Sequence, residues 1–234
     1  GSDKTRLSKR HGATSVMAYK EMGYLPEALV NYLVRLGWSH GDQEIFSLEE
    51  LVNLFSLNAV GKSAAIFNPE KLLWLNQHYI RESSIQRLIS EMIPFWQKKQ
   101  VDTSDTEFFG HIIGDMKTRV KSLVELSDAS SFYFAQKVDY APDAAEKYLS
   151  KETAVYLEAI KTRLAIFNDF TKEGIEKLLR EVVDEKNTKL KVIAPPLRVA
   201  LTGKTVSPGL DEVMITLGKD RVMQRLEMAV AYIK

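Results

Sequence analysis

Residues 68–82 read "NPEKLLWLNQHYIRE", and this stretch decides the class of fold. Asn68 is a residue type that caps the start of a helix, and the proline after it suits the first helical position. Leu72, Leu75 and Tyr79 then recur at intervals of three and four residues, the spacing of one face of an α-helix. The stretch therefore predicts an amphipathic helix.

The segments before this helix show the same pattern. "LPEALVNYLVRLGW" places Leu29, Leu33 and Leu36 at helical spacing behind an early proline. "SLEELVNLF" opens with a capping box, in which Ser47 and Glu50 are expected to satisfy each other's backbone N–H groups. Both segments are therefore predicted to be helices.

Most of the chain after residue 82 also has the period of a helix. We expect a helix over 83–96 that Pro94 bends or ends, and two short helices over 106–126 with a hinge near Gly114. Further helices are expected over 150–167 and 171–186, and two over 209–233 with a stop at Gly218. The proline-rich stretch 192–209, "VIAPPLRVALTGKTVSPG", is predicted to be irregular. Because no run alternates as a strand would, the fold class is all-α.

Composition limits the kind of protein. The chain has 234 residues, of which 45% are hydrophobic, so a folded core is expected. It has no cysteine, which excludes disulfides and thiolate sites, and it has neither an apolar run long enough to span a membrane nor a visible signal peptide. The leading Gly1-Ser2 resembles a cloning scar, so we expect the chain to be a piece of a longer protein.

The charge distribution is uneven although the net charge is only +1. Residues 1–20 hold five Lys or Arg and one acidic residue, and residues 186–234 hold nine Lys or Arg and four acidic residues. Two basic ends around an acidic middle indicate a polyanionic partner, or else a chance scatter of solvated charges.

A search for catalytic motifs finds little. The histidines His11, His40, His78 and His111 do not form an HExxH pattern or another set with metal-ligand spacing. "VGKSAA" at 60–65 is similar to the end of a phosphate-binding loop, but the upstream glycine and the preceding strand are missing. No GxSxG sequence is present. These residues alone indicate a non-catalytic helical module with one basic loop near its start.

That loop, "RLSKRHGATSV" at 6–16, resembles the ATP-binding signature loop of class I aminoacyl-tRNA synthetases, often spelled KLSKR in glutamyl-tRNA synthetases. Four further blocks resemble the same family in the same order: 24–55, 62–81, 131–149 and 196–227. The sequence departs from the family pattern where Arg6 replaces a lysine and where Asn68 replaces an aspartate. The family's nucleotide-binding fold would lie upstream of Asp3.

The resemblance implies a role for the loop in activation of glutamate by ATP, with magnesium. Arg6, Ser8, Lys9 and Arg10 would contact ATP, and Lys9 matches the catalytic lysine that stabilises charge on the leaving pyrophosphate. Residues 1–234 alone are expected to be inactive and to bind no cofactor, because the nucleotide fold is not among them.

The resemblance also implies tRNA recognition. Arg198 matches an arginine that contacts the anticodon, and Pro208 and Leu210 match the wall of the same pocket. Arg119 falls where the family reads the first anticodon base. The two lysines that flank it are expected to meet phosphate, and they are Lys117 and Lys121.

The resemblance predicts three parts: the signature loop and a stem-contact region (1–82), a first anticodon-binding subdomain (83–141) and a second one (142–234). The implied partners are the glutamate tRNA, ATP and glutamate, with no membrane, and a monomer in the cytoplasm is expected. A helical scaffold or adaptor that kept the layout is the alternative function. The related glutaminyl enzyme fits less well, because its anticodon-binding part is a β-barrel.

Overall fold

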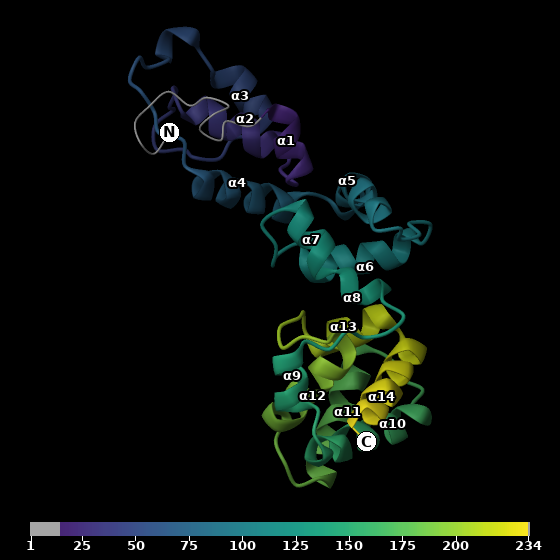
Figure 1. Ribbon diagram of the computed structural model, residues 1–234. Helices are drawn as coiled ribbons and strands as arrows, with labels where there is room; N and C mark the ends of the chain where they lie inside the picture. The colour runs from purple at the N-terminus through teal and green to yellow at the C-terminus, as the bar shows by residue number, and fades with distance from the viewer. Residues whose placement is uncertain (1–14, 234) are drawn as a thin grey trace. The chain divides into compact units, whose positions relative to one another are not determined.

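The computed structural model describes residues 15–233, and these form helices without any strand, which confirms the all-α prediction (Figure 1). The helices are α1 (Val16–Glu21), α2 (Pro26–Arg35), α3 (Leu48–Leu54), the 3-10 turn η2 (Leu57–Ala59), α4 (Pro69–Glu82), α5 (Ile85–Lys98), α6 (Thr106–Met116), α7 (Leu123–Ala129), α8 (Ser131–Phe134), α9 (Pro142–Tyr148), α10 (Lys151–Ala165), α11 (Lys172–Glu185), α12 (Leu190–Thr202), α13 (Leu210–Leu217) and α14 (Lys219–Ile233).

The predicted helix starts are confirmed at the caps. The Asn68 carboxamide accepts from the backbone N–H groups of Glu70 and Lys71 at 2.9 and 3.2 Å. Ser47 and Glu50 form the capping box, with bonds of 3.1 and 2.7 Å. Short polar side chains therefore set where these helices begin.

The chain divides into two compact units, each built from two stretches. The first unit holds the described residues up to Thr106 together with Met116–Ala129, and the second holds Glu107–Asp115 and Ser130 onward. The division into 1–82, 83–141 and 142–234 stays a prediction.

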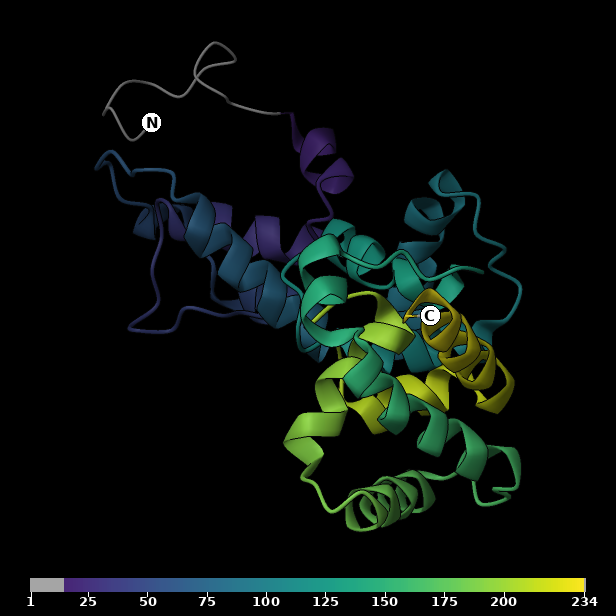
Figure 2. The ribbon, with the colours of Figure 1, turned by 60° about the horizontal axis from the view of Figure 1, so that its bottom comes forward.

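The first unit is built around the pairing of α2 with α4 (Figure 2). Its main hydrophobic cluster contains Ala28, Leu29, Tyr32, Leu72 and Leu75. Leu72 and Leu75 lie on the predicted buried face of α4, where Tyr79 is partly buried.

The predicted buried face of α2 is wrong at one position. Leu33 is 48% exposed, whereas Ala28, Leu29 and Tyr32 are buried. The core instead receives the neighbouring Tyr32, whose hydroxyl oxygen accepts from the backbone N–H of Asn68 at the start of α4.

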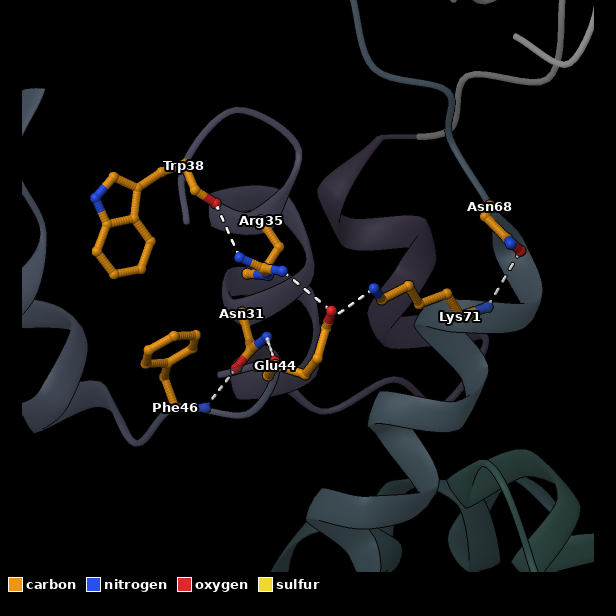
Figure 3. A network of polar contacts seen from close by, with 7 residues as sticks. All are labelled: Asn31, Arg35, Trp38, Glu44, Phe46, Asn68 and Lys71. Atoms are coloured by element: carbon orange, nitrogen blue, oxygen red, sulfur yellow. Dashed lines mark hydrogen bonds and ion pairs between the residues drawn. The ribbon is translucent and has the colours of Figure 1, made fainter. Parts of the chain in front are cut away.

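A polar network fastens the loop after α2 to the helices around it (Figure 3). The fully buried Asn31 accepts from the backbone N–H of Phe46 at 2.7 Å and donates to the carbonyl of Glu44 at 2.9 Å. The Glu44 carboxylate is paired with Lys71 at 2.7 Å and with Arg35 at 3.0 Å. The hydrogen bond from Lys71, and to a smaller extent the contacts with Arg35, hold the pKa of Glu44 below its ordinary value despite partial desolvation.

The second unit packs α10, α12 and α13 against α14. Arg225 of α14 is only 2% exposed, and its guanidinium donates to the carbonyls of Leu201, Phe132 and Ala135 at 2.6, 2.7 and 3.0 Å. These carbonyls lie at the C-terminal ends of α12 and α8, where a cation is favoured by the helix dipole. Burial lowers the pKa of Arg225 to about 10, so the side chain stays charged at neutral pH.

Three predictions about where helices break are wrong in part. α5 does not end at Pro94 but continues to Lys98, and the break between the two helices expected over 106–126 lies at 117–122 rather than near Gly114, because α6 continues to Met116. The carbonyl that Pro94 leaves without a helical partner belongs to Ser90, which is exposed to water. Gly114 is followed by the buried Met116, so packing of α6 outweighs the low helix propensity of glycine.

The third correction concerns the first part of the proline-rich stretch, because α12 runs through Pro195 and Pro196 to Thr202; residues 203–209 lie outside the helices, as expected. The carbonyls that lose a helical partner there belong to Lys191 and Val192, which are exposed. Pro196 itself is buried. The gain from burying this face of α12 exceeds the cost of two missing donors near its solvated start.

Candidate nucleic-acid interface

The basic loop that the sequence predicts to contact ATP lies outside the described residues, and this applies to Arg6, Ser8, Lys9 and Arg10. The described part begins with Ser15, whose hydroxyl caps α1 by accepting from the backbone N–H of Ala18 at 3.3 Å. Helix α1 therefore follows that loop directly in the chain.

Arg198 of α12 contacts the loop that follows its own helix. Its Nη1 donates to the carbonyl of Pro208 at 2.7 Å and also bonds both the hydroxyl and the carbonyl of Ser207. The Thr202 hydroxyl donates to the carbonyl of Arg198 at 2.8 Å and accepts from the backbone N–H of Lys204 at 3.2 Å. The structure thus brings together the predicted pair Arg198 and Pro208.

Gly203 makes the turn into this loop possible. Its φ is +74°, in the left-handed region, and a Cβ atom there would lie 2.0 Å from the carbonyl oxygen of Asp139. The carbonyl of Gly203 accepts from the backbone N–H of Ala141 at 2.9 Å. Only glycine permits this close approach, so the start of the loop is fixed by the backbone.

Arg198 also lines a groove of about 470 Å³ in the second unit. The groove is lined by Glu176, Leu179, Arg180, Val183, Leu190, Ala194, Arg198, Leu210 and Asp211. Leu210, the other predicted residue, therefore shares the groove with Arg198. Sequence reasoning missed Arg180, Glu176 and Asp211, since on α11 and α13 they look like ordinary exposed charges.

The groove carries charged side chains of both signs. Asp211 is paired with Lys172 at 2.9 Å. Although partial burial works against ionisation, this bond and backbone N–H groups hold the pKa of Asp211 below its ordinary value. The groove lining thus holds two carboxylates, of Glu176 and Asp211, and two guanidinium groups, of Arg180 and Arg198, while Lys172 beside the groove pairs with Asp211.

The other predicted nucleic-acid residues lie in the first unit, in the segment 117–122 between α6 and α7. Arg119 and Lys121 are exposed. Lys117 is half-buried, and its Nζ donates to the carbonyl of Ser83 at 3.1 Å. An ammonium group has three N–H donors, so this anchor does not use up the hydrogen-bonding capacity of Lys117.

Residues 15–233 lack the features of three other kinds of site. No group of three or more His, Asp or Glu side chains there is arranged to hold a metal ion. No helix in this described range is both long and apolar enough to cross a bilayer. Residues 60–65 lie outside any helix, so the helix that a phosphate-binding loop requires does not follow Lys62 and Ser63.

The family model for the anticodon binding domain matches residues 87–230, which include Arg119, Arg198 and the groove. The chain belongs to the anticodon-binding domain family. Residues 1–74 match the family model for the catalytic domain of class I tRNA synthetases (E and Q).

Relatives of this member of the anticodon-binding domain family align along its full length. Glutamate–tRNA ligase 1 of Syntrophus aciditrophicus is 59% identical over 234 residues, which are 100% of this chain and 50% of that protein. Glutamate–tRNA ligase of Geobacter sulfurreducens is 50% identical with the same coverage. The chain thus spans about half the length of the curated relatives it matches.

A solved structure shows the same fold. A crystal structure of a glutamate tRNA ligase from Elizabethkingia meningosepticum in complex with its amino acid matches with a TM-score of 0.87 and 30% identity. The match covers 99% of this chain and 49% of that one.

Proposed function

We propose that this chain is the tRNA-binding part of a glutamate–tRNA ligase, which uses ATP to attach glutamate to its tRNA. The groove at Arg198 carries the proposal, because it lies within the residues that match the anticodon-binding family and gathers cations beside an apolar wall. The names of the relatives supply the amino acid and the reaction.

The chemistry of the groove suits an unpaired base. Single-stranded bases are recognised by stacking and by hydrogen bonds to their edges. The side chains of Leu179, Val183 and Ala194 offer an apolar surface, and Arg198 and Arg180 carry guanidinium groups that can both stack and donate. We assign anticodon recognition to this groove, with Pro208 and Leu210 shaping its wall.

The exposed turn with Arg119 is the second proposed contact. Arg119 would read the first anticodon base, and Lys121 and Lys117 would meet phosphates nearby. Because the ammonium group of Lys121 would contact the backbone only, its contribution should be the same for every anticodon.

The third contact is the loop with Arg6, Ser8, Lys9 and Arg10, which would close over ATP in the longer enzyme. The magnesium ion would accompany the phosphates, and we assign no residue of this chain to it. Lys9 would stabilise negative charge that develops on the leaving pyrophosphate. In the full-length enzyme, Lys9→Ala should therefore lower the turnover of glutamate activation by about 100-fold or more, with a smaller effect on the Michaelis constant. A changed Michaelis constant at constant turnover would count against this role.

We further propose that the polypeptide 1–234 binds tRNA but makes no glutamyl-adenylate, since it lacks a complete pocket for ATP and glutamate. Two measurements test this pair of statements: glutamate-dependent exchange of pyrophosphate into ATP, and equilibrium titration with glutamate tRNA at several salt concentrations. Exchange above background would contradict the first statement. Binding that ignores the anticodon would favour a helical scaffold instead.

The proposed protein works as a monomer in the cytoplasm, where tRNA charging serves translation. Each predicted contact comes from a single copy of the chain, so recognition does not call for a second subunit. Sedimentation of residues 1–234 with and without tRNA measures the stoichiometry. A complex with two protein chains for each tRNA would overturn the monomer.

A further inference from the structure

The segment 117–122, which carries Arg119, is fastened to helix α4 near both of its ends. Near the first end, Nζ of Lys117 donates to the carbonyl of Ser83, the C-cap residue of α4, at 3.1 Å. Near the second end, the carbonyl of Lys121 accepts a bond of 2.7 Å from Nδ2 of Asn76, which lies in the middle of α4. Arg119 therefore lies between two anchors on the same helix.

Asn76 is fully buried, and its carboxamide joins three segments of the first unit. Oδ1 accepts from the backbone N–H of Leu25 at 2.7 Å. Nδ2 donates to the carbonyl of Gly23 at 3.2 Å as well as to the carbonyl of Lys121. Both amide hydrogens thus have carbonyl acceptors from segments far apart in the sequence.

The Gly23 turn is itself in contact with the chain just after Lys121. The carbonyl of Gly23 also accepts from the backbone N–H of Leu123 at 3.0 Å. With φ at +82°, Gly23 approaches so closely that a Cβ atom there would lie 2.5 Å from the backbone nitrogen of Val124. Asn76 is the side chain that holds this contact from the α4 side.

We infer that Asn76 is a positioning residue for Arg119, through the bond that fixes the Lys121 carbonyl to α4 and to the Gly23 turn. The inference rests on the proposed function, in which Arg119 reads an anticodon base. A side chain that reads a base must be held to within about 0.5 Å. Val120 packs into the core between Arg119 and Lys121, whereas Thr118, Arg119 and Lys121 are exposed, so the two anchors add the polar contacts that fix the ends of the segment.

The test measures binding of residues 1–234 to two glutamate tRNAs that differ only in the first anticodon base. The unaltered chain should bind the natural tRNA more tightly, and Arg119→Ala should lower the ratio of the two affinities by about tenfold. Asn76→Ala should lower the same ratio by a similar factor. In an Arg119→Ala background, Asn76→Ala should change the preference no further, because the two residues act on one contact.

Asn31 provides a matched control. It is another fully buried asparagine of the first unit, and it holds Phe46 and Glu44 rather than the segment 117–122. Asn31→Ala should lower the stability much as Asn76→Ala does, yet leave the ratio of the two affinities unchanged. If both variants lower the ratio of affinities, general destabilisation of the first unit is responsible, and the inference is wrong.

Lys117→Met tests the other anchor if Asn76→Ala does not fold. This variant removes the bond to Ser83 and leaves the buried amide intact, and it should also lower the ratio. If Lys117 only contacts phosphate, Lys117→Met should instead weaken the binding of both tRNAs by the same factor. If Lys117→Met and any folded variant at Asn76 keep the ratio while Arg119→Ala loses it, the positioning role is wrong and the proposed function stands. If Arg119→Ala keeps the ratio, the role of Arg119 fails first, and the inference fails with it.

Discussion

Nη1 of Arg198 lies 2.7 Å from the carbonyl oxygen of Pro208, ten positions further along the chain. The same nitrogen bonds Ser207, so the guanidinium closes the loop onto the helix that precedes it. A guanidinium held by backbone acceptors keeps a fixed plane, and a fixed plane is what stacking on a base or bonding its edge requires. The loop therefore orients the residue that we expect to recognise the anticodon.

Arg198→Ala should weaken binding to glutamate tRNA by about 1–3 kcal/mol and reduce the preference over a tRNA with an altered anticodon, while leaving the salt dependence nearly intact. The reason is that base contacts specify a sequence whereas phosphate contacts set the salt slope. Titrations at several salt concentrations measure both quantities. Arg163→Ala is the control, since Arg163 in the same unit pairs with Glu181 and Glu185 away from the groove. An equal loss for both tRNAs with a flatter salt slope would make Arg198 a phosphate contact.

Arg225→Met should lower the free energy of unfolding by about 3 kcal/mol, because it leaves the carbonyls of Leu201, Phe132 and Ala135 without their donor. Urea unfolding measures the loss. Arg221→Met, four residues earlier, removes an exposed guanidinium that lies 4.8 Å from the centre of the Phe108 ring, and it should cost only about 0.5–1 kcal/mol. Similar losses in the two variants would contradict the assignment.

The Asp115 carboxyl group should make the free energy of unfolding depend on pH in a specific way. Its carboxylate accepts from the hydroxyls of Tyr133 and Thr216 at 2.7 Å each. Burial raises its pKa above the ordinary 3.8 in spite of these bonds, with Glu212 raising it further and His111 lowering it. The folded chain thus holds this proton more tightly than the unfolded chain, and the contribution to stability falls as the pH rises through the interval between the two pKa values.

Asp115→Asn removes that titration and keeps an oxygen that can accept both hydroxyl bonds. The stability of the variant relative to the unaltered chain should therefore increase as the pH rises from 4, and then level off above the folded-state pKa. Urea unfolding of both proteins over pH 4–8 measures the difference, in which the other titrating groups largely cancel. A difference that stays constant with pH, or decreases, would show that burial does not dominate at Asp115.

Gly23→Ala and Gly114→Ala should have opposite effects on stability. Gly23 has positive φ, and a Cβ atom there would overlap the backbone of Leu123 and Val124, so we expect a loss of about 3 kcal/mol. Gly114 lies inside α6 with nothing within 4 Å of an added Cβ, so alanine should stabilise the chain by up to about 1 kcal/mol. Thermal unfolding measures both, and a stabilising Gly23→Ala would contradict the close approach.

The sequence predicts most helices because their signals are local. Asn68, Ser47 and Gly218 mark ends that depend only on neighbouring residues, and the structure has these ends where they are expected. The errors occur where distant packing outweighs local preference. Pro195 and Pro196 sit within α12 because of the partners that bury its face, which no local pattern reveals.

The site is predictable only in part for the same reason. Arg198 and Leu210 could be assigned from a resemblance, and the structure brings them to one groove. Arg180 reaches this groove from α11, and nothing in its own helix distinguishes it from other exposed arginines. Asn76 looks like any polar residue of an amphipathic helix, since its partners Leu25 and Lys121 lie 51 and 45 positions away.

The contact of Gly23 with Leu123 bears on how such proteins can be recombined. It joins two stretches of the first unit, and residues of the second unit, Glu107–Asp115, occur between those stretches in the chain. No single crossover point therefore separates the two units. A hybrid made by one splice within residues 15–129 would combine backbones from different parents inside one core. In hybrids of related proteins, the first unit should therefore stay stable only when both of its stretches come from the same parent.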